Sequence, residues 1–386
     1  MVFQITNTSE RDWLSQVRDF ANHRIGPAAV GWSMGQTPGG DDFTVAGQLG
    51  LLGMEVPTDV GGRGFGVAVK MAAMERLAAA DFGFAMSVVN TQNVALRLVV
   101  SAPEWISARF LPDLLAGRMS ACTALTEPGV GSDLAAVSTS ARRSGEGWVL
   151  DGEKCWIING RHAGLALVYA QTDPGAGLHG LGAFLVDLNA DGVTRYPIES
   201  AFSQTSIGTG GFTLESVYLP KDHLIMQPGT AFREILQEIN GARTYVAAMC
   251  CGMLNAALEA VTVYGRRRAA FGKTLSDLPA WREVQAEAET ALAAVQALTW
   301  EAVARIAANK DARLAAAQAK IGAVETCQRH LPALLHAMGA EGLRPEHCLT
   351  RHLAAVQSAA LTDGATAVLK QHVAKLSRPA HSTKEA

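Results

Sequence analysis

The sequence has no excess of positive charge and little cysteine. Its 33 lysines and arginines are outnumbered by 36 aspartates and glutamates, which gives a formal net charge of −3 at pH 7. A nucleic-acid-binding protein usually carries a clear basic excess, so we expect no nucleic-acid partner. The 6 cysteines contain no Cys-x-x-Cys pair, and the 10 histidines are scattered without the spacing of metal ligands. The sequence therefore predicts reduced thiols and no metal site.

Targeting patterns and long apolar runs are missing as well. The beginning of the chain has neither the basic stretch nor the apolar stretch of a signal peptide, so we expect a cytoplasmic protein. The most apolar window, Tyr245 to Val261, is interrupted by Asn255 and Glu259. It falls short of the ~18 uninterrupted apolar residues that a membrane span requires, so we expect a buried helix and no membrane partner.

Several common catalytic motifs are incomplete or missing. Gly31-Trp-Ser-Met-Gly35 matches the G-x-S-x-G pattern of hydrolases but lacks the flanking strand and helix which that chemistry needs. Gly129-Val-Gly131 lacks both the third glycine and the preceding strand of a dinucleotide-binding fingerprint. The sequence contains no P-loop and no H-E-x-x-H motif. We therefore expect neither a hydrolase elbow nor a Rossmann domain.

What the sequence does have is the composition of a globular protein, with 386 residues, 48% of them hydrophobic and 18% charged. Residues 1–120 show helical spacing, residues 121–225 alternate as strands do, and residues 226–386 are alanine-rich and helical again. The pattern predicts an α+β protein with an N-terminal helical domain, a central β domain and a C-terminal bundle of four or five helices. Within the bundle we expect helix breaks near Gly272, Pro279, Pro332, Pro345 and Gly364.

Some elements can be bounded more closely. The first helix is expected to begin with a cap at Ser9. The other expected helices and strands are Val67–Ala80, Ala95–Leu115 with a break near Pro103, Leu165–Ala170, Gly182–Asp187 and Phe212–Leu219.

The segment Ala124–Asp133 concentrates groups that can bind a flat polar cofactor. It contains the hydroxyls of Thr126 and Ser132, and its two glycines allow backbone N–H groups to approach an anion or a heterocycle. By itself such a segment is also an ordinary turn between helix and strand. The choice between these two interpretations depends on the segments around it.

Four further segments accompany it in order. A glycine-rich loop at Pro57–Gly66 precedes it, and Leu150–Gly160 (LDGEKCWIING), Arg266–Lys273 (RRRAAFGK) and Met338–Gly342 (MGAEG) follow it. Together the five segments resemble those of the acyl-CoA dehydrogenase family, over nearly the whole chain. The resemblance implies the same α–β–α order of domains, and it implies FAD as the cofactor.

The resemblance also implies roles for individual residues. In the same subunit, FAD is expected to contact Leu125, Thr126, Ser132, Trp156 and Ile158. A second subunit is expected to contribute Arg268, Phe271, His336 and Gly339, and Ser132, Arg243 and Gly364 are expected to contact the substrate. Arg268 has the fork geometry that suits a pyrophosphate, and Trp156 is suited to shielding the flavin ring from water. These residues imply a homodimer or a homotetramer.

In most members of the family a glutamate near the C-terminus removes the α-proton of the substrate. Asp363 occupies that position here, because twenty residues separate it from Leu343, the same spacing as in the family. The carboxylate is retained but is one methylene shorter. An alternative base position of the family corresponds to Ala242, and Glu238, one helical turn earlier, is the fallback candidate.

The resemblance thus implies FAD-dependent α,β-dehydrogenation of an acyl thioester carried by coenzyme A or a carrier protein. Asp363 would take the α-proton, the β-hydride would pass to flavin N5, and the electrons would leave to an electron-transfer flavoprotein or a similar acceptor. Two alternatives stay open. Ile158 stands where the family usually has a threonine, which favours a flavin monooxygenase or oxidase on the same fold, and a non-enzymatic role in assembly or sensing is the other.

Overall fold

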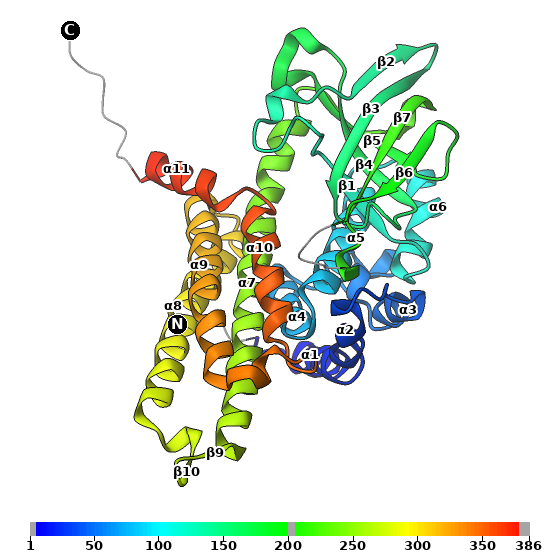
Figure 1. Cartoon of the computed structure of the whole chain (residues 1–386). Coiled ribbons are helices and arrows are strands. Elements are labelled where there is room, and N and C mark those ends of the chain that lie inside the picture. Colours follow the sequence, from blue (N-terminus) through cyan, green and yellow to red (C-terminus); the bar gives the residue numbers. More distant parts are fainter. Residues whose placement is uncertain (1–4, 200–204, 378–386) are drawn as a thin grey trace, which may run out of the picture.

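The computed structural model describes residues 5–199 and 205–377, and these form three regions (Figure 1). The N-terminal region is helical. Its α-helices are α1 (Thr8–Phe20), α2 (Gly26–Ser33), α3 (Gly40–Gln48), α4 (Val67–Ala80), α5 (Phe82–Ser101) and α6 (Glu104–Leu115). The expected helix at Val67–Ala80 is confirmed, and the expected break near Pro103 separates α5 from α6. The cap of α1 is Asn7 rather than Ser9, because the Asn7 side chain accepts a hydrogen bond from the Ser9 N–H.

A single eight-stranded sheet forms the central region. Its strands are β1 (Ala121–Ala124), β2 (Ser140–Ser144), β3 (Gly147–Ile157), β4 (Leu165–Gln171), β5 (Leu181–Asp187), β6 (Val193–Pro197), β7 (Gly210–Leu219) and β8 (Leu224–Met226). The strand order is β6-β7-β3-β2-β4-β5-β8, with β1 paired to β4. The strands expected from alternation are thus confirmed.

A bulge in β3 shapes the surface next to the sheet. The register between β3 and β7 shifts between Lys154 and Ile157, and Trp156 within the shift has a φ of 57°. A bulge turns the side chain of its extra residue out of the regular alternation. Trp156 is consequently 59% exposed while its neighbours Cys155 and Ile157 are buried.

The C-terminal region is a helical bundle. It consists of α7 (Ala231–Arg267), the short hairpin β9 (Ala269–Ala270) and β10 (Lys273–Thr274), α8 (Pro279–Ala307), α9 (Arg313–Met338), α10 (Leu349–Leu361) and α11 (Thr366–Leu376). The expected break at Pro332 is wrong, because α9 continues through it. Tertiary packing outweighs the cost of the proline, since Leu331 and Leu334 beside it are fully buried.

Helix α7 contains the apolar window noted in the sequence. By length and composition this helix is apolar enough to cross a membrane, but 67% of its most apolar window is buried inside the protein. Gly252 in this helix lies against the carbonyl of Glu75 in α4, where a side chain would not fit. The expectation of a buried helix is therefore confirmed, and α7 joins the bundle to the N-terminal helices.

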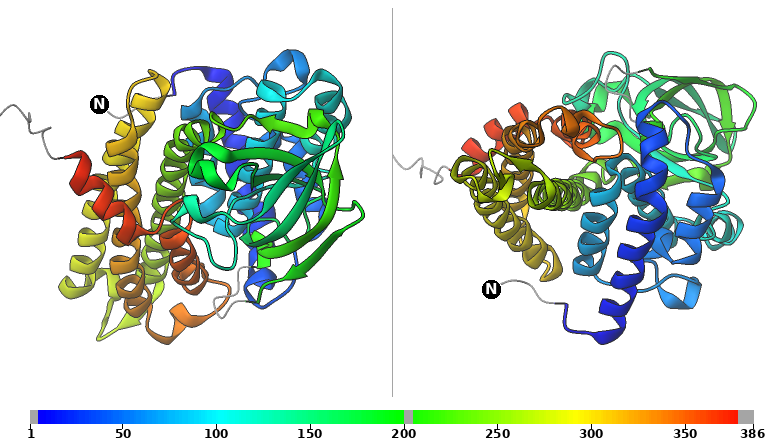
Figure 2. Two further views of the ribbon diagram at one scale, coloured as in Figure 1. Left: turned by 90° about the horizontal axis from the view of Figure 1, so that it is seen from above. Right: turned by 60° about the horizontal axis from the view of Figure 1, so that its bottom comes forward.

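The three regions meet around one space. One apolar core joins the N-terminal helices to the bundle, a second lies within the sheet, and a third lies between the sheet and helices α5 and α6. Figure 2 shows the bundle on one side of the molecule, with the sheet and the N-terminal helices together on the other. The region boundaries that we expected near residues 120 and 225 lie between α6 and β1 and at the end of β8.

Candidate active site

A large cavity lies where the three regions meet. Its volume is about 1420 Å³, and its wall is built from α4, α5, the loop after β1, the bulge of β3, the first turns of α7 and the turn between α10 and α11. Nine of the residues expected in the site line this cavity: Leu125, Thr126, Ser132, Trp156, Ile158, Glu238, Arg243, Asp363 and Gly364. The fold thus brings together segments that are more than 200 residues apart in the sequence.

A buried ion pair fixes the loop after β1. The ammonium group of Lys154 lies 2.7 Å from a carboxylate oxygen of Glu127, and both side chains are almost completely buried. The same carboxylate accepts hydrogen bonds from the backbone N–H and the hydroxyl of both Ser138 and Thr139. Burial would raise the pKa of Glu127, but Lys154 and these donors lower it to about 2. Glu127 is therefore ionised and holds the loop from inside.

The loop is also joined to the bulged strand. The backbone N–H of Cys155 donates to the carbonyl of Thr126 at 3.1 Å, and Lys154 donates to the carbonyl of Leu125 at 3.1 Å. These bonds place Leu125 and Thr126 beside Trp156. Sequence analysis did not single out Glu127 or Lys154, although a lysine in an otherwise half-buried strand is a signal of a buried partner.

This part of the cavity fits a flat aromatic cofactor such as a flavin. Trp156 presents a large indole ring to the cavity instead of burying it in the core. Gly131 lines the cavity and has open space where a side chain would begin, so a ligand can approach the backbone of the loop there. An accessible indole, a hydroxyl on Thr126 and a second one on Ser132 suit stacking and hydrogen bonding to a heterocycle.

Asp363 lies in the turn between α10 and α11. Its φ of 54° is in the left-handed region, which aspartate tolerates better than most residues. Lys320 donates to the carbonyls of both neighbours of Asp363, Thr362 and Gly364. The Nε of Arg243 donates to the carbonyl of Asp363 itself at 3.4 Å. Two cations therefore hold this turn from the inner side of the bundle.

The carboxylate of Asp363 is buried with one oxygen unpaired. Tyr245 interacts with this carboxylate and helps to keep its pKa down, whereas Oδ2 is shielded from solvent and has no hydrogen-bond partner among the described residues. Burial raises the pKa of Asp363 above its ordinary value, and Lys320, Tyr245 and Arg243 oppose that rise. A buried carboxylate with one free oxygen is poised to accept a proton from a group in the cavity.

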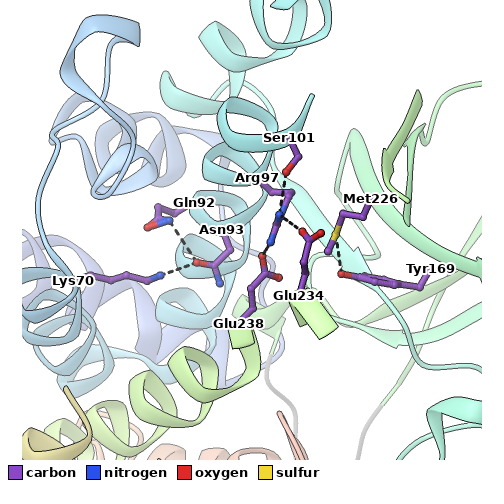
Figure 3. Close-up of polar contacts among 9 residues, drawn as sticks. All are labelled: Lys70, Gln92, Asn93, Arg97, Ser101, Tyr169, Met226, Glu234 and Glu238. Atoms are coloured by element: carbon purple, nitrogen blue, oxygen red, sulfur yellow. Dashed lines mark hydrogen bonds and ion pairs between the residues drawn. The ribbon is translucent and has the colours of Figure 1, made fainter. Parts of the chain in front are cut away.

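Glu238, the fallback base, has a different environment. It lies on α7 at the edge of the cavity, and Arg97 of α5 forms an ion pair with it (Figure 3). Arg97 also pairs with Glu234 at 2.8 Å. The Glu238 side chain is 47% exposed. A paired, half-exposed carboxylate is less suited to proton abstraction than the buried free oxygen of Asp363.

Four expected FAD contacts lie away from the cavity. Arg268, Phe271, His336 and Gly339 are all exposed, and none of them lines it. Phe271 is 93% exposed and lies between β9 and β10, at the end of the bundle opposite α11 (Figure 1). Within one subunit the structure therefore does not bring these residues to the site, as expected if they belong to the site of a second subunit.

Comparison with known proteins agrees with this geometry. Three models of the acyl-CoA dehydrogenase family match the chain: the N-terminal domain at residues 7–118, the middle domain at 122–217 and the C-terminal domain at 231–377. The chain belongs to the acyl-CoA dehydrogenase family. It is an FAD-dependent oxidoreductase that acts on the CH–CH bond of an acyl-CoA.

Individual relatives of this acyl-CoA dehydrogenase cover most of its length. It is 32% identical over 341 residues to the mitochondrial short-chain specific acyl-CoA dehydrogenase of Homo sapiens, covering 88% of this chain and 82% of the relative. It is 30% identical to the cyclohex-1-ene-1-carbonyl-CoA dehydrogenase of Geobacter metallireducens, covering 88% and 90%. The structure of butyryl-CoA dehydrogenase from Megasphaera elsdenii has the same fold, with a TM-score of 0.91, 24% identity and coverage of 97% and 99%.

Tyr245 was missed by sequence analysis, and its contact with Asp363 predicts a pH effect in the dehydrogenase. A base works when it is deprotonated, so flavin reduction should slow as the pH falls through the pKa of Asp363. Tyr245→Phe removes a donor to the carboxylate and raises that pKa further. We expect the acidic limb of the plot of rate against pH to move to higher pH. Lys320 and Arg243 are unchanged in this variant and continue to lower the pKa of Asp363.

Stopped-flow measurement of anaerobic flavin bleaching across pH checks this. Tyr264→Phe, on the same helix but remote from Asp363, is the matched control and should leave the profile in place. An unmoved limb in Tyr245→Phe would show that the hydroxyl does not set the protonation of the base.

Proposed function

We propose that Asp363 is the catalytic base of this acyl-CoA dehydrogenase and removes the α-proton of the acyl-CoA. The observation that carries this proposal is the buried, unpaired Oδ2 of Asp363 in the wall of the cavity. Four other carboxylates line the described wall. Glu55 and Glu238 are paired with Lys70 and Arg97, Asp133 accepts from the N–H of Ala135, and Glu199 is exposed near Arg161. Among the described residues of the wall, Asp363 is thus the carboxylate whose unpaired oxygen is shielded from solvent.

The surrounding residues support this role in distinct ways. Lys320 donates to the carbonyls on either side of Asp363 and Arg243 donates to the carbonyl of Asp363 itself, which fixes the backbone that carries the side chain. Tyr245 favours the ionised carboxylate, and Oδ2, which has no hydrogen-bond partner among the described residues, is the oxygen that we expect to take the proton. The same two cations stabilise the carboxylate in its charged form before the reaction. We therefore expect the fixed backbone of this turn, rather than a longer side chain, to bring the aspartate carboxylate within reach of the α-proton.

Bound FAD would supply the oxidising group that accepts the β-hydride. In the chain itself, Thr126, Ser132 and Trp156 would hold the flavin side of the cavity, and Ser132, Arg243 and Gly364 would contact the thioester side. Relatives are named for short-chain acyl-CoA and for cyclohex-1-ene-1-carbonyl-CoA, so we propose coenzyme A rather than a carrier protein as the thiol of the substrate. We propose an electron-transfer flavoprotein or a similar protein as the electron acceptor.

Anaerobic mixing with acyl-CoA tests this function. A dehydrogenase transfers electrons from the thioester alone, so its yellow colour should bleach without any other reductant. A monooxygenase on the same fold stays yellow until a reductant is added. Absence of bleaching across linear, branched and cyclic acyl-CoA substrates would contradict the proposed base and the proposed substrate.

We further propose that the protein is a homodimer or a dimer-based homotetramer in which Arg268, Phe271, His336 and Gly339 complete the FAD site of the other subunit. Their exposure at one end of the bundle supports this, since a 93% exposed phenylalanine is costly to leave in water. Arg268→Ala should therefore lose FAD while folding normally, because a guanidinium fork that binds phosphate is removed.

The FAD content after gel filtration and the mass by light scattering check this prediction. Arg305→Ala is the matched control, because Arg305 lies on the same bundle and, within residues 5–199 and 205–377, contacts the exposed Glu301 and the backbone carbonyl of Asp311. A monomer that retains FAD would contradict the assignment of these residues to a second subunit.

A further inference from the structure

One wall of the cavity is polar where an acyl chain would need an apolar surface. Glu55, Lys70 of α4 and Asn93 of α5 all line it, and Lys70 is only 7% exposed (Figure 3 shows Lys70 and Asn93). Next to them the wall is apolar, with Val67, Met71 and Leu96. The three polar residues therefore form a distinct subsite, which we call the polar subsite.

The hydrogen bonds within the polar subsite use one oxygen of Glu55 and the side-chain oxygen of Asn93. Lys70 Nζ donates to Glu55 Oε2 at 2.6 Å and to Asn93 Oδ1 at 2.8 Å. Gln92 Nε2 also donates to Asn93 Oδ1, at 3.4 Å. Because an ammonium group can only donate, this contact fixes which amide atom of Asn93 faces Lys70.

Several atoms of the subsite consequently stay available. Among the described residues, no group accepts a hydrogen bond from Asn93 Nδ2, and none donates to Glu55 Oε1. Lys70 has a third N–H beyond the two in use. The polar subsite thus offers both donors and a carboxylate acceptor to a ligand in the cavity.

The charges around the subsite are already paired. Lys70 faces Glu55, and Arg97 faces Glu234 and Glu238. A ligand carboxylate would meet the negative charge of Glu55 at close range and would have to compete with it for Lys70. A neutral group meets no such penalty.

The polar subsite lies within reach of a substrate held at Asp363. The ammonium group of Lys70 is 5.9 Å from the centre of the Tyr245 ring, and Tyr245 also interacts with Asp363. Tyr245 therefore lies next to both the polar subsite and the proposed base. An acyl chain of a few carbons spans such a ring.

Stability alone does not explain the polar subsite. Replacing a buried ion pair by apolar residues of similar volume is often neutral or stabilising. An apolar wall would also bind an alkyl chain better, because burying Glu55 and Asn93 against methylene groups leaves their free atoms without partners.

We infer that the polar subsite binds a hydroxyl group, or another neutral group that both donates and accepts hydrogen bonds, carried by the acyl chain of the substrate. A hydroxyl accepts from Asn93 Nδ2 or Lys70 and donates to Glu55. This inference deepens the proposed function and depends on it for the placement of the thioester. It gives a substrate class, the hydroxylated acyl-CoAs, in place of simple alkyl ones.

Calorimetry on the enzyme whose bound FAD has been reduced beforehand with dithionite tests the inference without turnover, because a reduced flavin accepts no hydride. Hexanoyl-CoA is compared with its 4-, 5- and 6-hydroxy analogues and with adipoyl-CoA. We expect at least one hydroxy analogue to bind about tenfold or more tightly than hexanoyl-CoA, since a site built to hydrogen bond discriminates against an analogue that lacks the group. Adipoyl-CoA should bind more weakly than that analogue. Equal affinity for hexanoyl-CoA and all three hydroxy analogues would overturn the inference.

Two variants separate recognition from structural support. Asn93→Leu should abolish most of the tenfold preference and strengthen the binding of hexanoyl-CoA. Glu55→Gln should instead strengthen the binding of adipoyl-CoA, because it removes the repelling charge. Asn255→Leu, which places the same change on an exposed face of α7, should alter neither. A preference that survives in Asn93→Leu together with unchanged adipoyl-CoA binding in Glu55→Gln would overturn the subsite.

Bleaching by the same thioesters distinguishes this inference from the proposed function. An affinity difference without any bleaching would contradict the proposed dehydrogenation and support the subsite. Bleaching that is equally fast with hexanoyl-CoA and its hydroxy analogues, at equal affinity, would support the dehydrogenation and contradict the subsite.

Discussion

Asp363→Asn should bind FAD and acyl-CoA and yet reduce its flavin about 10²–10⁴-fold more slowly than the wild type, the usual contribution of a general base. The amide has nearly the same shape as the carboxylate, so the turn held by Lys320 and Arg243 should persist. What is lost is the proton acceptor at Oδ2. Stopped-flow bleaching under nitrogen measures the rate, and the flavin spectrum shows whether FAD and the thioester are bound.

Two companion variants sharpen this result. Glu238→Gln should bleach close to the wild-type rate, because Glu238 is engaged by Arg97. Asp363→Glu should hold or raise the rate on linear acyl-CoA and lower it on bulky or cyclic acyl-CoA, because the longer side chain reaches further into the cavity. If Asp363→Asn bleaches as fast as the wild type while Glu238→Gln does not, the assignment of the base is wrong.

Asp363 shows how much of the candidate site can be predicted from the sequence. Its position relative to Leu343 is a count of residues, and the family resemblance converts that count into a role. Its environment is not a matter of counting, because Tyr245 and Lys320 come from α7 and α9 and meet Asp363 only in the packed bundle. The sequence therefore predicts Asp363 as the base, and this stays a prediction, whereas the sequence identifies neither of the groups that influence its pKa.

The helices and strands show the same difference between features set by local sequence and features set by tertiary packing. Helices and strands with strong local patterns, such as Val67–Ala80 and β7, are predicted well because their periodicity is a property of a few neighbouring residues. Pro332 was predicted to end a helix because proline removes a backbone donor, and that local cost is real. The buried neighbours of Pro332 outweigh it, and their burial is decided by helices that are distant in sequence.

The cavity residues divide in a similar way. Trp156 and Thr126 were predicted from the resemblance, and both line the cavity. Lys70 and Asn93 were not predicted as site residues, because each is a polar residue in a helical segment, where such residues are usually exposed to solvent. Only the packing of α4 against α5 reveals that Lys70 is buried and that the two side chains face each other.

Lys154→Met should have the largest effect on stability, because it leaves the buried carboxylate of Glu127 without its cation. Breaking one partner of a buried ion pair typically costs about 3–5 kcal/mol. The loop with Leu125 and Thr126 would lose its anchor to the bulged strand, so FAD should be lost as well. Urea denaturation at pH 7 and the FAD absorbance after gel filtration measure the two effects.

The loss of stability in Lys154→Met should depend on pH. Glu127 has its pKa lowered from 4.5 to about 2 in the folded protein, so its stabilising contribution is present above pH 4.5 and is lost as the pH falls toward 2. The difference in stability between the wild type and Lys154→Met should therefore shrink on acidification through that range.

Two further variants test whether the stability lost in Lys154→Met comes from the unpaired charge of Glu127. Lys370→Met breaks an ion pair with Glu325 whose side chains are 57% and 44% exposed, and it should cost less than about 1 kcal/mol. Glu127→Gln combined with Lys154→Met removes both charges and should recover part of the stability, because no unpaired ion stays buried. If the double variant is as unstable as Lys154→Met alone, the hydrogen bonds from Ser138 and Thr139 to an ionised carboxylate, rather than the ion pair, hold the cofactor loop.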